Sequence, residues 1–146
     1  MDQYIHGIAV AARGVPVTLI ISLVAVLGGL VLGLLVALAK RSKFNILRGI
    51  ATVYVDILRG TPLLVQVLIL GYGVPQLVRA ITGMQFNWEP LILVGFIACG
   101  VNSSAYMAEI IRSGLQAVDI GQTEAARSLG LNSRQTMRYV IVPQAF

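Results

Sequence analysis

An uncharged apolar run from Gly14 to Ala39, bounded by Arg13 and Lys40, constrains this chain more than any other feature. A membrane-spanning helix needs about 20 predominantly apolar residues to cross about 30 Å of hydrocarbon, and this run exceeds that length. A cleaved signal peptide is the alternative, but its apolar region is only about 7–15 residues long. Because further apolar segments follow, we expect a retained membrane helix over residues 15–39.

The composition supports the same class for the whole chain. It is 57% hydrophobic and only 12% charged, with a mean hydropathy of +0.83, whereas soluble domains are about 25% charged. So few charges cannot cover a globule of 146 residues with a solvated surface, and disorder requires low hydrophobicity together with high net charge. The sequence predicts an all-α, polytopic membrane helical bundle.

The second apolar segment is expected to form one helix over residues 50–78. It contains Asp56 and Arg59, which can pair on one helix face, followed by Thr61 and Pro62. Proline removes a backbone donor, so it should kink this helix or begin its membrane portion. Two registers stay open: the helix buries Asp56 and Arg59, or the part before the proline lies at the membrane interface. Arg59 has two interpretations, an internal ion pair or a gating residue.

The third apolar segment lies between Glu89 and Glu109 and is expected to form a helix over residues 90–111. Phe86 and Trp88 precede it and suit an interfacial aromatic belt. Glu109 lies near the other end of this helix, where a pair with Arg112 is favoured over contact with a cationic substrate.

Small residues on the first helix indicate close helix packing. Gly28, Gly29 and Gly33 are expected to lie on overlapping faces of that helix. Without side chains, they allow a second helix to approach closely within a membrane.

Lysine and arginine are unevenly distributed between the loops, which predicts the orientation of the chain. Between the second and third apolar segments the only such residue is Arg79. The segments on either side are richer: Lys40, Arg41, Lys43 and Arg48 before, and Arg112, Arg127, Arg134 and Arg138 after. Positive loops stay in the cytoplasm, so we expect the first and third loops inside, and the second loop and the N-terminus outside. The net charge of +5 then follows from topology and requires no nucleic-acid partner.

A polar stretch after the third segment predicts a short capped helix over about residues 119–130. Asp119 can be its N-cap, with Gln122 completing a capping box. Gly130 suits a left-handed C-cap, with Leu131 as the apolar residue beyond it. A second helix start follows, Asn132 with Gln135 three residues later, as in a capping box. It begins a segment over residues 133–146, where the chain is expected to be truncated within a further helix.

Two interpretations of this short helix arise from its residues alone. Its small residues, Gly121, Ala125, Ala126 and Ser128, let another surface approach its backbone. It either packs only on its own protein or docks into a groove of a cytoplasmic partner.

Three motifs give this chain a family resemblance. Glu124-Ala125-Ala126, then Gly130, Val140 and Val142-Pro143, resembles the EAA motif of bacterial ABC importer membrane subunits. Two further stretches resemble the polar amino acid branch of that family (histidine, glutamine or arginine type). They are Arg59-Gly60-Thr61-Pro62-Leu63-Leu64-Val65-Gln66 and Asn102-Ser103-Ser104-Ala105-Tyr106. Ile120 departs from the pattern, because the branch commonly has proline there.

The resemblance implies a type I permease-like fold, with a single transmembrane permease domain over residues 1–146. It implies a permease subunit of an ATP-driven importer for polar amino acids in the bacterial inner (plasma) membrane. The implied partners are cytoplasmic ATP-binding subunits, a second permease subunit (the same or different), an extracytoplasmic amino-acid-binding protein, the amino acid and membrane lipid. ATP and Mg would bind to the partner ATPase. The implied ATPase-docking residues of the coupling helix are Gly121, Glu124, Ala125, Ala126 and Gly130.

Polar residues inside the apolar segments are candidates for the translocation pathway. They are Arg59, Thr61, Gln66, Asn102, Ser103, Ser104 and Tyr106. Such residues either join helices by hydrogen bonds worth about 1 kcal/mol or less or bind the ammonium or carboxylate of the substrate. Both interpretations stay open.

Catalysis and metal binding by this chain are not expected. Cys99 is the only cysteine and His6 the only histidine, so no multi-ligand thiolate or imidazole site is expected. No glycine cluster continues into Lys-Ser or Lys-Thr, so there is no P-loop and no cofactor is expected on this chain. The rival functions are an ion-gradient-driven carrier or channel fragment and a non-transporting membrane scaffold.

Overall fold

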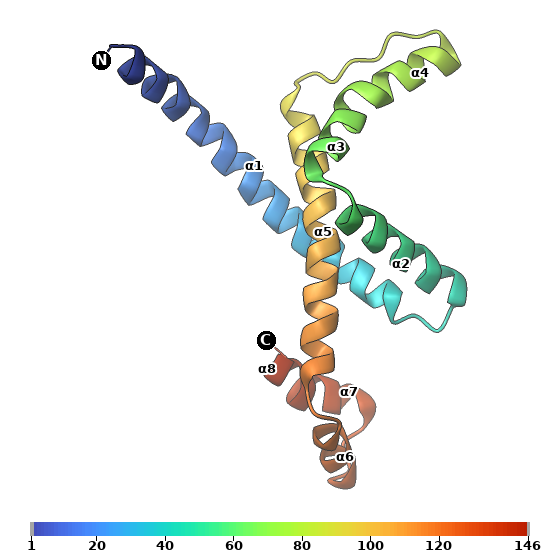
Figure 1. Ribbon diagram of the computed structural model, residues 1–146. Coiled ribbons are helices and arrows are strands. Elements are labelled where there is room, and N and C mark those ends of the chain that lie inside the picture. Colours follow the sequence, from blue (N-terminus) through green and yellow to red (C-terminus); the bar gives the residue numbers. More distant parts are fainter. Residues whose placement is uncertain (1, 146) are drawn as a thin grey trace.

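The computed structural model describes residues 2–145, which contain helices and no strand. Two long helices form the frame, α1 (Asp2–Lys40) and α5 (Ile92–Ala117), which cross obliquely (Figure 1). Helix α1 extends beyond the predicted range 15–39 at both ends, whereas α5 begins inside the predicted range 90–111 and continues past its end. Charged residues such as Arg13 and Glu109 end an apolar run, but they do not end a helix.

Two of the three predicted glycines make the crossing possible. A Cβ on Gly29 would lie 2.6 Å from the Cβ of Ser103, and one on Gly33 would lie 2.6 Å from the Cβ of Met107. The backbones of α1 and α5 therefore touch, as small residues permit in membrane helices. Gly28 does not contribute, because a Cβ there would meet nothing within 4 Å. The prediction for Gly28 was wrong, since it lies one residue off the contact stripe.

The predicted helix over residues 50–78 is broken into several parts. Helix α2 (Asn45–Gly60) ends at Thr61, where the backbone becomes extended (φ −118°, ψ 140°). Then follow α3 (Leu63–Leu68), the π-helical turn η1 (Ile69–Gly73) and α4 (Val74–Thr82). The cause is Pro62, which lacks an N–H and disfavours helical geometry at the residue before it.

Within residues 2–145, three helical segments are long and apolar enough to cross a membrane: His6–Lys40, Leu63–Thr82 and Ile92–Ala117. The second of these begins directly after Pro62 and excludes Asp56. Of the two registers left open by the sequence, the break favours the one in which the membrane portion starts at the proline.

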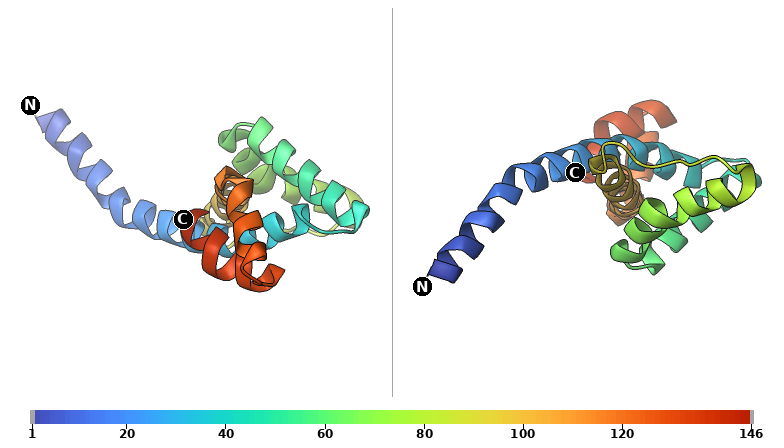
Figure 2. Two further views of the ribbon diagram at one scale, coloured as in Figure 1. Left: turned by 90° about the horizontal axis from the view of Figure 1, so that it is seen from below. Right: turned by 90° about the horizontal axis from the view of Figure 1, so that it is seen from above.

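The ends of the helices alternate between two sides of the molecule. In Figure 1, the beginning of α1 and the loop between α4 and α5 lie at the top, while the α1–α2 loop and the C-terminal helices lie below. The views along the perpendicular direction agree, because the C-terminal helices face the viewer from below and the α4–α5 loop from above (Figure 2). The lysine and arginine distribution predicts the same alternation of loops, and which side is cytoplasmic stays a prediction.

The packed core is small and lies where α1, α2 and α5 meet. It consists of Ala37, Val55, Ala105, Ala108 and Ile111. Alanines dominate because the helices approach closely, so larger side chains would not fit between them.

The C-terminal part consists of α6 (Ile120–Ser128), α7 (Ser133–Thr136), the π turn η2 (Met137–Ile141) and α8 (Val142–Ala145). Gly130 has φ +84°, and the Leu131 N–H donates to the Ala126 carbonyl at 3.1 Å, which confirms the left-handed cap. The capping box of Asn132 and Gln135 is also confirmed.

The N-cap of α6 differs from the predicted capping box. The Asp119 carboxylate accepts a hydrogen bond from the Gly121 N–H at 2.7 Å, as expected for an N-cap. Gln122 does not reach back to it; its Oε1 accepts from the Gln144 side chain at 3.2 Å. The predicted box was wrong, because a partner in α8 competes for the Gln122 side chain.

Candidate functional site

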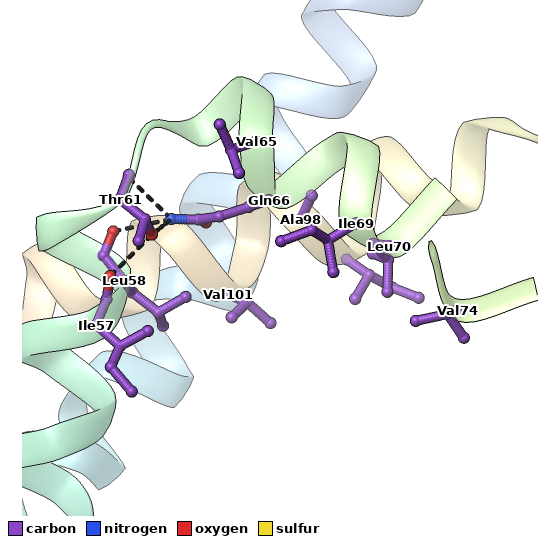
Figure 3. A pocket seen from close by; sticks show the side chains of 11 residues that line it. Ile57, Leu58, Thr61, Val65, Gln66, Ile69, Leu70, Val74, Ala98 and Val101 are labelled. Atoms are coloured by element: carbon purple, nitrogen blue, oxygen red, sulfur yellow. Dashed lines mark hydrogen bonds between the residues drawn. The ribbon is translucent and has the colours of Figure 1, made fainter. Parts of the chain in front are cut away.

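The break between α2 and α3 is surrounded by polar groups. In a continuous helix the Leu58 carbonyl would accept from residue 62, but Pro62 has no N–H to donate. The Gln66 amide replaces it, with Nε2 donating to the Leu58 carbonyl at 2.9 Å and to Thr61 Oγ1 at 2.9 Å (Figure 3). Asn102 of α5 donates to Gln66 Oε1 at 3.2 Å and approaches the Leu58 carbonyl at 3.4 Å.

This network brings three of the predicted pathway residues together. Thr61 and Gln66 come from the broken segment and Asn102 from α5, and their side chains are joined by hydrogen bonds. Amides carry both donors and acceptors. The cluster can therefore bind either an ammonium or a carboxylate group if it exchanges one of its internal bonds.

Two recesses adjoin the cluster. One, of about 310 Å³, is lined mainly by apolar side chains, with Thr61 and Gln66 as its polar groups (Figure 3). A second, of about 250 Å³, includes Asn102 and Ser103 together with Ser22 of α1. The Gln66–Asn102 pair thus lies between an apolar and a more polar space, as expected of a small-molecule site with few placed polar groups.

Ser103 and Ser104 have different surroundings. Ser103 borders the second recess and packs against Gly29. Ser104 is 0% exposed, and its hydroxyl is bonded to the Tyr54 hydroxyl at 2.6 Å and donates to the Val101 carbonyl at 2.7 Å. Ser104 thus joins α5 to α2 and is buried in this structure, and its place in the translocation pathway stays a prediction. The sequence offered no signal for Tyr54, because its partner lies on another helix.

Arg59 and Tyr106 form a contact that the sequence did not predict. The Arg59 guanidinium lies 5.4 Å from the centre of the Tyr106 ring, a cation–π geometry. Asp56 and Arg59 are both exposed, and among residues 2–145 no ion pair joins them. The predicted pair was wrong, because the ring of Tyr106 on α5 offers the guanidinium another partner.

Glu109 joins α1 to α5 through two cations. The predicted contact with Arg112 is present, with Arg112 Nε donating to Glu109 Oε1 at 2.8 Å. Lys40, the last residue of α1, adds an ion pair at 3.1 Å to the other carboxylate oxygen. This second pair was not predicted, since it joins residues far apart in the sequence.

The proposed docking residues of α6 do not share one surface. Glu124, Ala125 and Gly130 are exposed, and Gly121 is half-buried. Ala126 is 4% exposed and lies against its own chain. The Ala126 side chain therefore packs within its own chain in this structure, and its docking role stays a prediction. Helix α6 is bent back against η2, so one side of it is already occupied.

Metal binding has no support in the described part of the chain. Among residues 2–145, no group of three or more His, Cys, Asp or Glu side chains lies close enough to hold a metal ion.

Comparison with known proteins decides the family. The model of the family described as "Binding-protein-dependent transport system inner membrane component" matches residues 29–146. The chain belongs to this family. The matched range covers the α1–α5 crossing, the broken segment and the capped helix α6.

Relatives of this inner membrane component carry names that agree with the resemblance. The chain is 44% identical to the probable amino-acid ABC transporter permease protein YckA of Bacillus subtilis, over 91% of this chain and 55% of that protein. It is 40% identical to the putative glutamine transport system permease protein GlnP of Rickettsia prowazekii, over 98% of this chain and 62% of that protein. It is also 40% identical to the arginine transport system permease protein ArtQ of B. subtilis, over 92% of this chain and 58% of that protein.

A solved structure shares the fold. It is described as the crystal structure of an amino acid ABC transporter with histidines, and it matches with a TM-score of 0.77 and 43% identity, over 94% of this chain and 64% of that one. The chain thus spans between 55% and 64% of the length of these relatives.

Proposed function

We propose that this protein acts as a permease subunit of an ATP-driven ABC importer for polar amino acids. The observation that carries the proposal is family membership over residues 29–146, together with relatives named as amino-acid, glutamine and arginine permeases. The protein itself supplies the pathway and no catalysis. It has no P-loop, so ATP and Mg bind to a partner chain.

The amide cluster at the α2–α3 break is the substrate-contacting site of this proposal. An amino acid carries an ammonium and a carboxylate, which need acceptors and donors respectively. Gln66, Asn102 and Thr61 offer both kinds of group beside two recesses. Because these groups are bonded to each other when the site is empty, substrate entry replaces one internal hydrogen bond by another.

The exposed side of α6 is the ATPase-docking surface of this proposal. Glu124 and Ala125 lie on it, Gly130 follows exposed in the turn after the helix, and Ala126 is buried within the same chain. A helix anchored at both ends by caps moves as a unit, so displacement of α6 by an ATPase would be transmitted to α5 through Val118 and Asp119. The N-terminus then lies outside and α6 in the cytoplasm, as the positive-inside distribution favours.

The remaining partners follow from the same proposal. A second permease subunit and an extracytoplasmic amino-acid-binding protein complete the importer, in a bacterial inner (plasma) membrane. The alternative is a carrier or channel driven by an ion gradient, which needs no capped docking helix.

Reconstitution separates the two functions. The full permease, its ATPase and its binding protein are incorporated into proteoliposomes, and uptake of radiolabelled glutamine and arginine is measured. We expect uptake that requires ATP and is inhibited by vanadate. Uptake driven by a proton or sodium gradient without ATP would overturn the proposal in favour of the carrier.

A further inference from the structure

A second backbone carbonyl in the broken segment loses its helical donor. In an α-helix the Leu70 carbonyl would accept from the Val74 N–H, but that N–H donates to the Ile69 carbonyl in the π turn η1. The next residue, Pro75, has no N–H. The Leu70 carbonyl therefore has neither its α-helical nor its π-helical backbone donor, at a place where the segment is apolar enough to span a membrane.

A side chain from the α4–α5 loop satisfies this carbonyl. Trp88 Nε1 donates to the Leu70 carbonyl at 2.8 Å. The indole is half-buried and also makes an edge-on contact with the Phe86 ring, with 5.1 Å between ring centres. Trp88 therefore joins the loop to the helix and Phe86 packs against its ring, while their place in an interfacial belt stays a prediction.

The π turn η1, to which Trp88 is bonded, adjoins the proposed substrate site. Leu70 and Val74 line the same recess as Gln66, which lies one helical turn before Leu70. On the other side, Gln76, Arg79 and Asn87 line a polar recess of about 140 Å³ between α4 and the loop. The Trp88–Leu70 bond is thus the direct link between the loop and the wall of the recess that holds Gln66.

We propose that Trp88 is a positioning residue for transport. It donates a hydrogen bond to the Leu70 carbonyl, which Pro75 leaves without a backbone donor, and this bond holds η1 in its π geometry. It thereby sets the position of the recess that contains Gln66 relative to the α4–α5 loop. The inference rests on the proposed function. It concerns a residue that contacts neither the amide cluster nor α6.

The test combines a substitution of Trp88 with a substitution of Pro75. Trp88→Phe keeps an aromatic ring against Phe86 but removes the donor. Pro75→Ala restores a backbone N–H, so that the Leu70 carbonyl regains a donor along the helix in either the π or the α pattern. The double variant should therefore recover what Trp88→Phe loses. Tyr72→Phe, at an exposed aromatic residue of the same turn, is the matched control.

Two measurements are made on the full permease in its complex with the ATPase. Amide hydrogen exchange over residues 69–82 should be about 3- to 10-fold faster in Trp88→Phe, and return to the parent rate in the double variant. In the uptake assay, Trp88→Phe should raise the apparent KM for the amino acid by a similar factor, again with recovery in the double variant.

Each other outcome counts against the proposal. An unchanged exchange rate in Trp88→Phe would show that the hydrogen bond does not stabilise the turn. If the double variant keeps the faster exchange of Trp88→Phe, the effect comes from the indole ring and not from its N–H donor. Faster exchange with unchanged uptake constants would leave the bond but overturn its positioning role. Absence of ATP-dependent uptake in the parent protein, with the exchange pattern as expected, would overturn the proposed function while retaining the link between loop and helix.

Discussion

At the scale of single residues, two carbonyls explain much of the local structure. Leu58 and Leu70 each lose a helical donor near a proline, and each is satisfied by a side chain from elsewhere, Gln66 in one case and Trp88 in the other. An unsatisfied buried carbonyl costs about 1–3 kcal/mol, and in hydrocarbon it costs several kcal/mol. The prolines therefore create a need for polar side chains inside apolar segments, and the same side chains become available for function.

Replacing Asn102 by alanine should impair substrate binding more than folding. Its side chain bonds to Gln66 at 3.2 Å, and loss of an interhelical bond of this kind costs about 1 kcal/mol or less. We expect a rise in the apparent KM for uptake of about three- to tenfold, since the amide also faces the recess. The same variant should keep its melting temperature in detergent within a few degrees of the parent.

The control for Asn102→Ala is Thr52→Val, whose hydroxyl bonds only within its own helix, to the Arg48 carbonyl. Uptake should be unaffected by it. An unchanged KM in Asn102→Ala would remove Asn102 from the pathway and leave it as a helix-joining residue.

At the scale of elements, close backbone approach joins α1 to α5. Gly33→Ala would put a Cβ 2.6 Å from the Cβ of Met107 and 2.9 Å from the Ser104 carbonyl oxygen. Overpacking of this kind costs about 1–3 kcal/mol, so we expect a lower melting temperature in detergent.

Gly28→Ala is the matched control, because its Cβ would meet nothing within 4 Å. Equal melting temperatures of the two variants would contradict the crossing described above.

Helix α6 has an exposed and a buried alanine side by side, which separates docking from folding. Ala125→Leu should weaken retention of the ATPase in a pull-down by about tenfold or more, since a bulky side chain keeps the two surfaces apart. It should leave the melting temperature of the permease unchanged. Ala126→Leu should lower that temperature, because Ala126 is only 4% exposed and overpacking costs about 1–3 kcal/mol.

The reverse pattern, with Ala126→Leu affecting only ATPase retention, would contradict the position of α6 against η2. Gly130→Val should behave like Ala126→Leu, because a β-branched residue at φ +84° is strained.

At the scale of the whole molecule, the loops alternate between two sides, and Lys40, Glu109 and Arg112 tie the lower end of α1 to α5 (Figure 1). Cysteine labelling can test which of the two sides faces the cytoplasm. Cys99 is replaced by alanine, and single cysteines are introduced at Asn87 in the upper loop and at Ser128 in α6, both exposed.

We expect an impermeant maleimide to label the cysteine at residue 87 in intact cells, and the one at residue 128 only after permeabilisation. Charge distribution is the physical reason, since positive loops are retained in the cytoplasm. Labelling of residue 128 in intact cells would show the opposite orientation in the membrane, with α6 outside and out of reach of a cytoplasmic ATPase.

The sequence by itself determined the features that depend on neighbouring residues. Apolar length predicted the membrane helices, Gly130 the left-handed cap and Asn132 with Gln135 the capping box, because each follows from chemistry within a few positions. Only the tertiary structure decided which groups from distant helices meet: Tyr54 with Ser104, Lys40 with Glu109, and Trp88 with the Leu70 carbonyl. It also decided against local pairs that looked favourable, such as Asp56 with Arg59, since a partner on another helix competes for the same side chain. Local rules state what a residue needs, and only the packed chain determines which partner supplies it.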